Sequence, residues 1–77
     1  MTDKKKLAEI FGKVLKEERL RNNLSQEALA YNCGLERTYI SFLERGLRQP
    51  TITTIFTLSE NLKISPEALI KKVSEYK

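Results

Sequence analysis

Three hydrogen-bonding side chains, Arg37, Thr38 and Ser41, stand close together in the run ERTYISFLERG. On a helix of about 3.6 residues per turn, this spacing places all three in one outward sector. An arginine fork can donate to O6 and N7 of guanine, and threonine can offer a methyl group to thymine or a hydroxyl to a base or phosphate. These residue types in this pattern favour recognition of nucleic acid.

Further residues around this run suit the phosphate backbone. Gln26 begins a preceding helix, where a backbone N–H points out of the helix end and can seat a phosphate. Arg45 and Arg48 follow the run and can meet the phosphates of a flanking strand. Tyr39 and Phe42, if exposed, suit contact with sugar-phosphate or a thymine methyl group. Partial burial against the following loop is the alternative for both aromatic residues.

The element that presents these side chains must be turned away from the rest of the chain. Two short amphipathic runs meet at Gly34, which permits the positive φ that a tight corner needs. Ser25 is a suitable N-cap for the first run. The pattern predicts helices over 25–33 and 36–45, joined as a helix-turn-helix across 25–45. Gly34 could instead be an ordinary helix stop, with a plain solvated face after it.

Helical periodicity covers nearly all of the remaining chain, and no strand-like alternation of any length occurs. Caps and stops at Asn23, Thr51 and Ser65 complete the pattern. The predicted fold is all-α, a compact bundle of five short helices in one domain over 1–77, with 1–5 frayed. The other three helices are expected over about 7–22, 52–62 and 66–76. The apolar side of the first comprises Ile10, Phe11, Val14, Leu15 and Leu20.

Composition excludes several classes of function. The 77 residues carry a net charge of +4, which favours a polyanionic partner. Cys33 is the only cysteine and there is no histidine, so we expect no internal disulfide and no His-based zinc site, and only metals held by carboxylates alone remain open. No metal site and no cofactor are predicted. No nucleophile–base pair or Gly-rich phosphate loop indicates an enzyme. No apolar run could span a membrane, and a reducing cytoplasm is the expected setting.

The chain resembles the Cro and lambda-repressor type of helix-turn-helix regulator. The resemblance rests on FGKVLKEER at 11–19, LSQEALA at 24–30, Gly34-Leu35, ISFLERGLRQPT at 40–51 and LKIS at 62–65. Within that group, LERTYISFLERGLRQPT is most similar to the controller proteins of bacterial restriction–modification systems. The resemblance implies a five-helix bundle that binds double-stranded DNA as a homodimer on a pseudo-palindromic operator and regulates transcription of restriction–modification genes.

The resemblance also implies roles for individual residues. Arg37, Thr38, Ser41 and Phe42 match base-facing positions, although the family often has a polar side chain where this chain has Phe42. Gln26, Tyr39, Arg45 and Arg48 are the predicted phosphate contacts. Arg19 and Glu44 match a structural ion pair. Glu27 matches the position where lambda-type activators touch the sigma subunit of RNA polymerase, so the regulator could activate as well as repress.

The helices over 52–76 carry more apolar residues than one small core plainly absorbs. They are Ile52, Ile55, Phe56, Leu69, Ile70, Val73 and Tyr76, and all but Leu69 are predicted at the dimer interface. No small-molecule ligand is expected. The alternative function is a protein-interaction module on the same fold, such as an antitoxin or a phage-type repressor. Such a module has no need for Arg37, Arg45 and Arg48 around one outward face.

Overall fold

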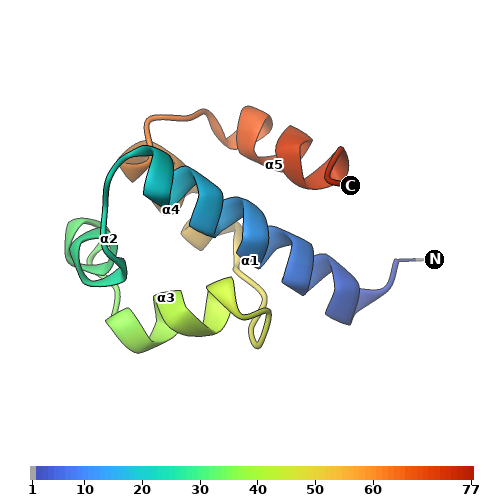
Figure 1. Cartoon of the computed structure of the whole chain (residues 1–77), viewed down its shortest axis with the longest axis horizontal. Helices are drawn as coiled ribbons and strands as arrows, with labels where there is room; N and C mark the ends of the chain where they lie inside the picture. The colour runs from blue at the N-terminus through green and yellow to red at the C-terminus, as the bar shows by residue number, and fades with distance from the viewer. Residues whose placement is uncertain (1) are drawn as a thin grey trace.

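The computed structural model describes residues 2–77 as five helices joined by short turns. They are α1 (Lys4–Arg21), α2 (Gln26–Cys33), α3 (Arg37–Glu44), α4 (Ile52–Asn61) and α5 (Pro66–Ser74). In Figure 1, α1 runs through the middle of the molecule, with α5 above it, α3 below it and α2 at its far end. The described chain measures 35 × 23 × 21 Å. The predicted all-α fold of five helices is confirmed.

Four of the five helices begin at a side-chain cap. Ser25, Thr51 and Ser65 accept hydrogen bonds from the backbone N–H three residues further on, at 3.0, 3.1 and 3.1 Å. Asp3 caps α1 in the same way, accepting from the Lys6 N–H at 3.1 Å. The predicted frayed segment 1–5 is therefore wrong for Lys4 and Lys5, which are helical because Asp3 caps them. Met1 lies outside the described residues.

A residue in the left-handed conformation follows four of the helices. Asn23 follows α1 with φ of 57°, Gly34 follows α2 with φ of 68°, and Gly46 follows α3 with φ of 72°. Lys63 follows α4 with φ of 57°, a conformation that its residue type does not predict. These turns let five short helices fold back on one another within a small volume.

The core is formed by all five helices. Its fully buried large residues are Leu15, Leu29, Ile40, Leu43, Leu58, Leu62 and Leu69. Burying one such side chain contributes about 1.5–3 kcal/mol. α1 packs against α3 and α5, α2 packs against α3 and α4, and α4 packs against α5. The core thus holds α3 by one side only, through Ile40 and Leu43.

The exposure of two apolar residues differs from what the sequence pattern indicates. Leu20 is 54% exposed because it lies on the side of α1 opposite the core, so its assignment to the apolar side is wrong. Val73 is only 8% exposed and packs into the core of the single chain. It therefore has little surface left to contribute to the predicted dimer interface.

A buried carboxylate joins α1 to α5. Glu18 is buried, and its Oε2 lies 3.5 Å from both Arg21 Nε and Lys72 Nζ. The Asn22 amide donates to the carbonyl oxygens of Glu18 and Leu62, at 2.9 and 3.0 Å. These polar contacts lie on the side of α1 away from α3, so they stabilise the bundle without restricting the outward face of α3.

Candidate nucleic-acid interface

The corner between α2 and α3 is held by backbone geometry. Gly34 adopts φ 68° and ψ 29°, and a Cβ built on it would meet no atom within 4 Å. Glycine is therefore favoured here because of the positive φ, and not because a side chain would lack space. The Leu35 N–H donates to the Ala30 carbonyl at 2.9 Å, which closes the turn. α3 then begins at Arg37, one residue later than the predicted start.

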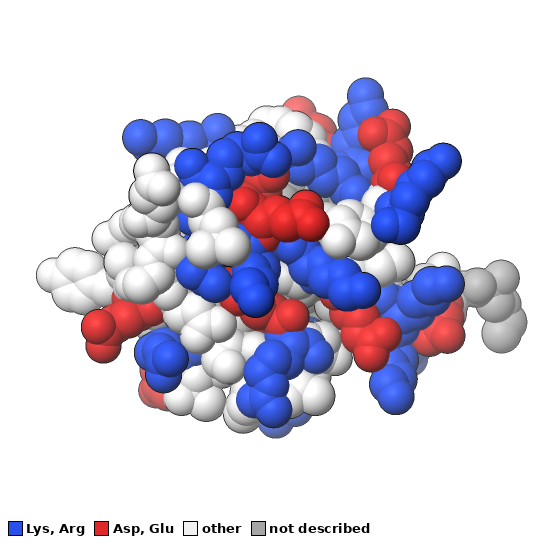
Figure 2. Space-filling model, viewed as in Figure 1, with Lys and Arg blue, Asp and Glu red and all other residues white. Residues whose placement is uncertain are grey.

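The outward side of α3 carries most of the predicted DNA-contacting residues. Arg37 and Thr38 are exposed, and Ser41 is half-buried on the next turn. Tyr39 is half-buried and packs against the core, so only part of its surface could reach a phosphate. Figure 2 shows Lys and Arg side chains along the edge of the molecule where α3 and its following loop lie, and also over α1. Basic charge alone therefore does not single out one face.

Among the arginines, ion pairing separates those around α3 from those of α1. Within residues 2–77 the ion pairs involve Arg19, Glu18 and their partners. Arg37, Arg45 and Arg48 are exposed, and none of them forms an ion pair with a carboxylate in the described chain. These three unpaired guanidinium groups, one at the start of α3 and two beyond its end, leave their charge available for an external anion.

The start of α2 lies beside the start of α3. A shallow depression of about 470 Å³ is lined by Arg37 together with Ser25, Gln26 and Glu27. Arg37 thus shares a surface with the α2 N-terminus, where backbone N–H groups and the helix dipole favour an anion. Glu27 is exposed in the first turn of α2. The structure brings together the residues predicted at these two helix starts.

Arg19 and Glu44 form a buried clamp between α1 and α3. Arg19 Nε and Nη2 donate to the two carboxylate oxygens of Glu44, at 2.6 and 3.0 Å. The two side chains are only 8% and 4% exposed. Arg19 Nη1 also donates to the Leu24 carbonyl at 2.8 Å. The hydrogen bonds that Arg19 donates to Glu44 raise the pKa of Arg19; burial opposes this shift, and the negative charge of Glu44 adds to it.

The Gln26 side chain belongs to this clamp. Its amide Nε2 donates to Glu44 Oε1 at 3.0 Å. The side chain therefore orients α2 on α3, and the backbone N–H is the group left to fulfil the predicted phosphate contact. The sequence did not reveal this bond, because its two residues lie on different helices and meet only after the corner forms.

The loop after α3 folds back onto the helix. The Arg48 guanidinium lies over the Phe42 ring, with Cζ 5.1 Å from the ring centroid. Phe42 is half-buried. A small groove beside this loop is lined in part by Lys4 and Lys5, next to Arg48. Both lysines lie in the segment that the sequence predicts to be frayed, and the Asp3 cap is the one local signal that they begin a helix.

The remaining chemically distinctive residue is Cys33. Burial raises the pKa of its thiol, and a hydrogen bond with Asn61 lowers it by a smaller amount. The thiol is therefore protonated at neutral pH and packs as a small core residue. Among residues 2–77, no three His, Cys, Asp or Glu side chains cluster as metal ligands. No helix of the described chain has the length and apolar character needed to cross a bilayer.

Comparison with known proteins places this geometry in a family. The helix-turn-helix family profile matches residues 15–69. The control protein C.BamHI of Bacillus amyloliquefaciens is 42% identical over 62 residues, covering 79% of this chain and 76% of that protein. The control protein C.SmaI of Serratia marcescens is 39% identical over 66 residues, covering 86% and 79%.

Two solved structures agree with the sequence matches. The restriction–modification controller protein C.AhdI from Aeromonas hydrophila superposes with a TM-score of 0.78 at 40% identity, over 80% of this chain and 94% of that one. The controller protein C.Esp1396I superposes with a TM-score of 0.81 at 33% identity, over 90% of both chains. The chain belongs to the helix-turn-helix family, in the group that includes the restriction–modification controller proteins.

Proposed function

We propose that the protein is a sequence-specific DNA-binding regulator of transcription that acts on restriction–modification genes. The observation that carries the proposal is the contrast between paired and unpaired arginines. Arg19 is buried and fully bonded, whereas Arg37, Arg45 and Arg48 are exposed without carboxylate partners. The control proteins that the chain resembles support a regulatory role and not a catalytic one.

In this proposal α3 lies in the major groove and α2 crosses the DNA backbone. Arg37, Thr38 and Ser41 read base edges from the first turns of α3. The Gln26 backbone N–H binds phosphate at the start of α2, and Arg45 binds phosphate beyond α3. The Arg19–Glu44 clamp keeps α3 at a fixed angle to the bundle, so that these contacts form without rearrangement.

The direct test is the salt dependence of binding to duplex DNA. A protein that neutralises several phosphates releases counterions, so its affinity should fall by about two orders of magnitude or more as salt rises about fourfold. The matched control is Lys13→Ala, which removes an exposed basic side chain of α1 that forms no ion pair in the described chain, and it should leave the slope unchanged. A flat response would favour the alternative, a protein-interaction module.

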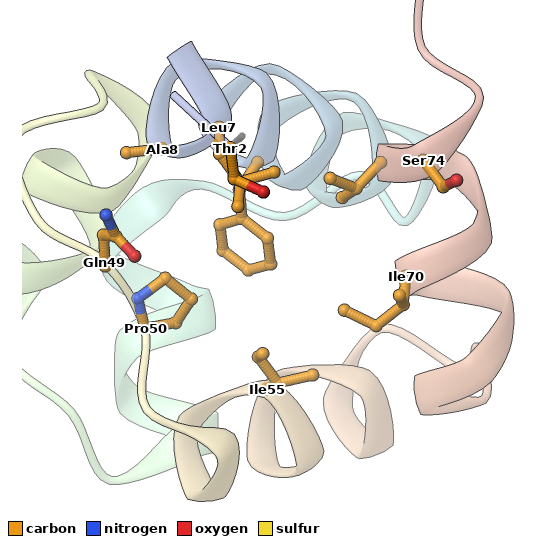
Figure 3. Close-up of a pocket in the computed structure, with 10 residues that line it drawn as sticks. Thr2, Leu7, Ala8, Gln49, Pro50, Ile55, Ile70 and Ser74 are labelled. Carbon is orange, nitrogen blue, oxygen red and sulfur yellow. The ribbon is translucent and has the colours of Figure 1, made fainter. Parts of the chain in front are cut away.

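We infer that the functional unit is a homodimer formed through α4 and α5. Ile52, Phe56 and Ile70 are 73%, 51% and 45% exposed. All three line an open apolar groove of about 590 Å³ between α4 and α5. A second apolar groove of about 390 Å³ shares Ile70, and Figure 3 shows Ile55 of α4 and Ile70 of α5 directed into it from two sides. A contiguous apolar surface of this kind favours an interface, and a two-fold partner would match a pseudo-palindromic operator.

Tyr76, which is also predicted at the interface, makes a hydrogen bond within the chain. Its hydroxyl donates to Glu17 Oε2 at 3.1 Å, which ties the end of α5 to α1. This hydrogen bond raises the pKa of Tyr76. The proposed interface therefore centres on Ile52, Phe56 and Ile70, with Ile55 behind them.

Sedimentation measurements test the dimer. Phe56→Asp should convert it to a folded monomer, because an aspartate at the centre of an apolar interface would be buried without a partner. Leu20→Asp is the matched control, since Leu20 is 54% exposed on α1, outside the proposed interface. If both variants sediment as the unaltered protein does, the interface lies elsewhere.

A further inference from the structure

The aromatic ring of Phe42 and the guanidinium of Arg48 form a stacked pair on the outer edge of α3. Arg48 Cζ lies 5.1 Å from the ring centroid, within the range of a cation–π interaction. Arg48 Nη1 donates to the Leu47 carbonyl at 3.0 Å, which fixes the guanidinium from a second side. An exposed arginine is thus held in one orientation before any ligand arrives.

The turn after α3 creates this pair. The Gly46 N–H donates to the Leu43 carbonyl at 3.2 Å, and the Leu47 N–H donates to the Phe42 carbonyl at 2.9 Å. This pattern is a Schellman motif, and it reverses the chain at Gly46, where φ is 72°. Arg48, two residues further along, is consequently returned to the last turn of α3.

Contacts with α1 keep the turn in place. A Cβ on Gly46 would lie 2.7 Å from Glu9 Cγ and 2.9 Å from Glu9 Cα, so the loop backbone packs directly on α1. The Gln49 amide donates to the Lys4 carbonyl at 3.3 Å. The loop that carries Arg48 is therefore anchored on both sides of that residue, and its position relative to α3 is set by the fold.

We propose that Phe42 is a positioning residue for DNA binding, which holds the Arg48 guanidinium ready for a backbone phosphate. The inference rests on the proposed DNA-binding function. It replaces the predicted base contact of Phe42, because the guanidinium lies over the ring and covers one of its two faces. An arginine already ordered in the free protein loses less side-chain freedom on binding, which strengthens the phosphate contact.

A double-mutant cycle tests the proposal, with fluorescence anisotropy of a short random-sequence duplex as the probe. Phe42→Leu removes the ring and should weaken binding about two- to fivefold. Phe42→Tyr keeps the ring and should bind as the unaltered protein does. Arg48→Ala should weaken binding more, and should reduce the dependence of log affinity on log salt by about 0.9. Adding Phe42→Leu to Arg48→Ala should cause no further loss.

The salt slope distinguishes positioning from a general loss of structure. Phe42→Leu should leave the slope unchanged, because the arginine still reaches the phosphate, and it should leave the melting temperature near that of Phe42→Tyr. If Phe42→Leu does not fold, Phe42→Met completes the cycle in its place. Equal losses from Phe42→Leu with and without Arg48 would overturn the proposal, since Phe42 would then contact DNA itself. An unaltered affinity in Phe42→Leu would overturn it as well.

The same experiment separates this inference from the proposed function. If the unaltered protein shows no salt-dependent affinity for the duplex, the DNA-binding function fails and the positioning role fails with it. If the unaltered protein binds and only the coupling between Phe42 and Arg48 is absent, DNA binding stands and the positioning role alone is wrong.

Discussion

Charged residues have different roles on the two sides of α3. On the side facing α1, Glu44 is bonded to Arg19 and Gln26 and is almost completely buried. On the outward side, Arg37 and Arg48 have no carboxylate partner within the described chain. The difference shows that the partner of a charge, and not its presence, indicates its role.

Packing follows the same division. A Cβ added to Gly12 of α1 would lie 2.5 Å from the carbonyl oxygens of both Leu43 and Glu44, so α1 touches the backbone of α3. On the outward side, α3 contacts its own following loop, where the Arg48 guanidinium lies over the Phe42 ring. Changes on the inner side should therefore alter folding stability, and changes on the outer side should alter binding.

The largest effect is expected from Glu44→Ala. It leaves the Arg19 guanidinium buried without its partner, which should lower the free energy of unfolding by about 3–5 kcal/mol. Urea denaturation measures this loss. Glu36→Ala is the matched control, because Glu36 is exposed and its side chain makes no cap hydrogen bond, so it should change stability by less than about 0.5 kcal/mol. Similar losses from both variants would remove the distinction between the two sides of α3.

Gly12→Ala tests the backbone contact on the inner side. The new methyl group meets two carbonyl oxygens that belong to backbone, so α1 and α3 must separate. We expect a loss of about 1–3 kcal/mol from overpacking, even though alanine is the better helix former. Lys13→Ala, at the exposed neighbouring position, controls for helix propensity in the same thermal melts. A more stable Gly12→Ala variant would show that the contact yields at little cost.

The sequence predicted the elements well because local signals specify them. Caps at Ser25, Thr51 and Ser65 and the glycine corner at Gly34 need only a few neighbouring residues to act. The start of α1 was misplaced because lysines after Asp3 resemble a solvated tail as much as a first turn. Val73 and Leu20 were misassigned because apolar spacing marks a helix face only approximately.

The candidate site was predicted in its residue types but not in its connections. Gly12 carried no visible signal, because the need for glycine arises from α3 crossing α1. The hydrogen bond from Gln26 to Glu44 depends on the chain reversal at Gly34. The stacking of Arg48 on Phe42 likewise depends on the reversal at Gly46. A periodic pattern describes one helix at a time, so it does not predict contacts between helices and loops.

Arg37→Ala tests the outer side. It should cost about 1–3 kcal/mol of binding free energy on the preferred operator and relax sequence choice at one position. The melting temperature should not change, because Arg37 is exposed and unpaired in the described chain. Binding measured against a randomised duplex pool shows the altered preference, with Arg45→Ala as the matched comparison that should weaken all sequences alike. A uniform loss for Arg37→Ala would identify it as a phosphate anchor.

The smallest effect on DNA affinity is expected from Glu27→Lys. Glu27 is exposed in the first turn of α2, beside Arg37 but not paired with it, so its removal frees no buried charge. Loss of a favourable helix-dipole contact should cost no more than about 1 kcal/mol of stability. If Glu27 touches the sigma subunit of RNA polymerase, transcription in vitro from the regulated promoter should lose its activation while operator affinity is kept.

Glu27→Gln is the matched control, since it removes the charge without reversing it and should give an intermediate loss of activation. Concurrent loss of activation and operator affinity would contradict the assignment, because Glu27 would then act on the DNA-binding surface itself. The α2–α3 unit would in that case have one outward surface for DNA, instead of a DNA surface and a separate polymerase surface.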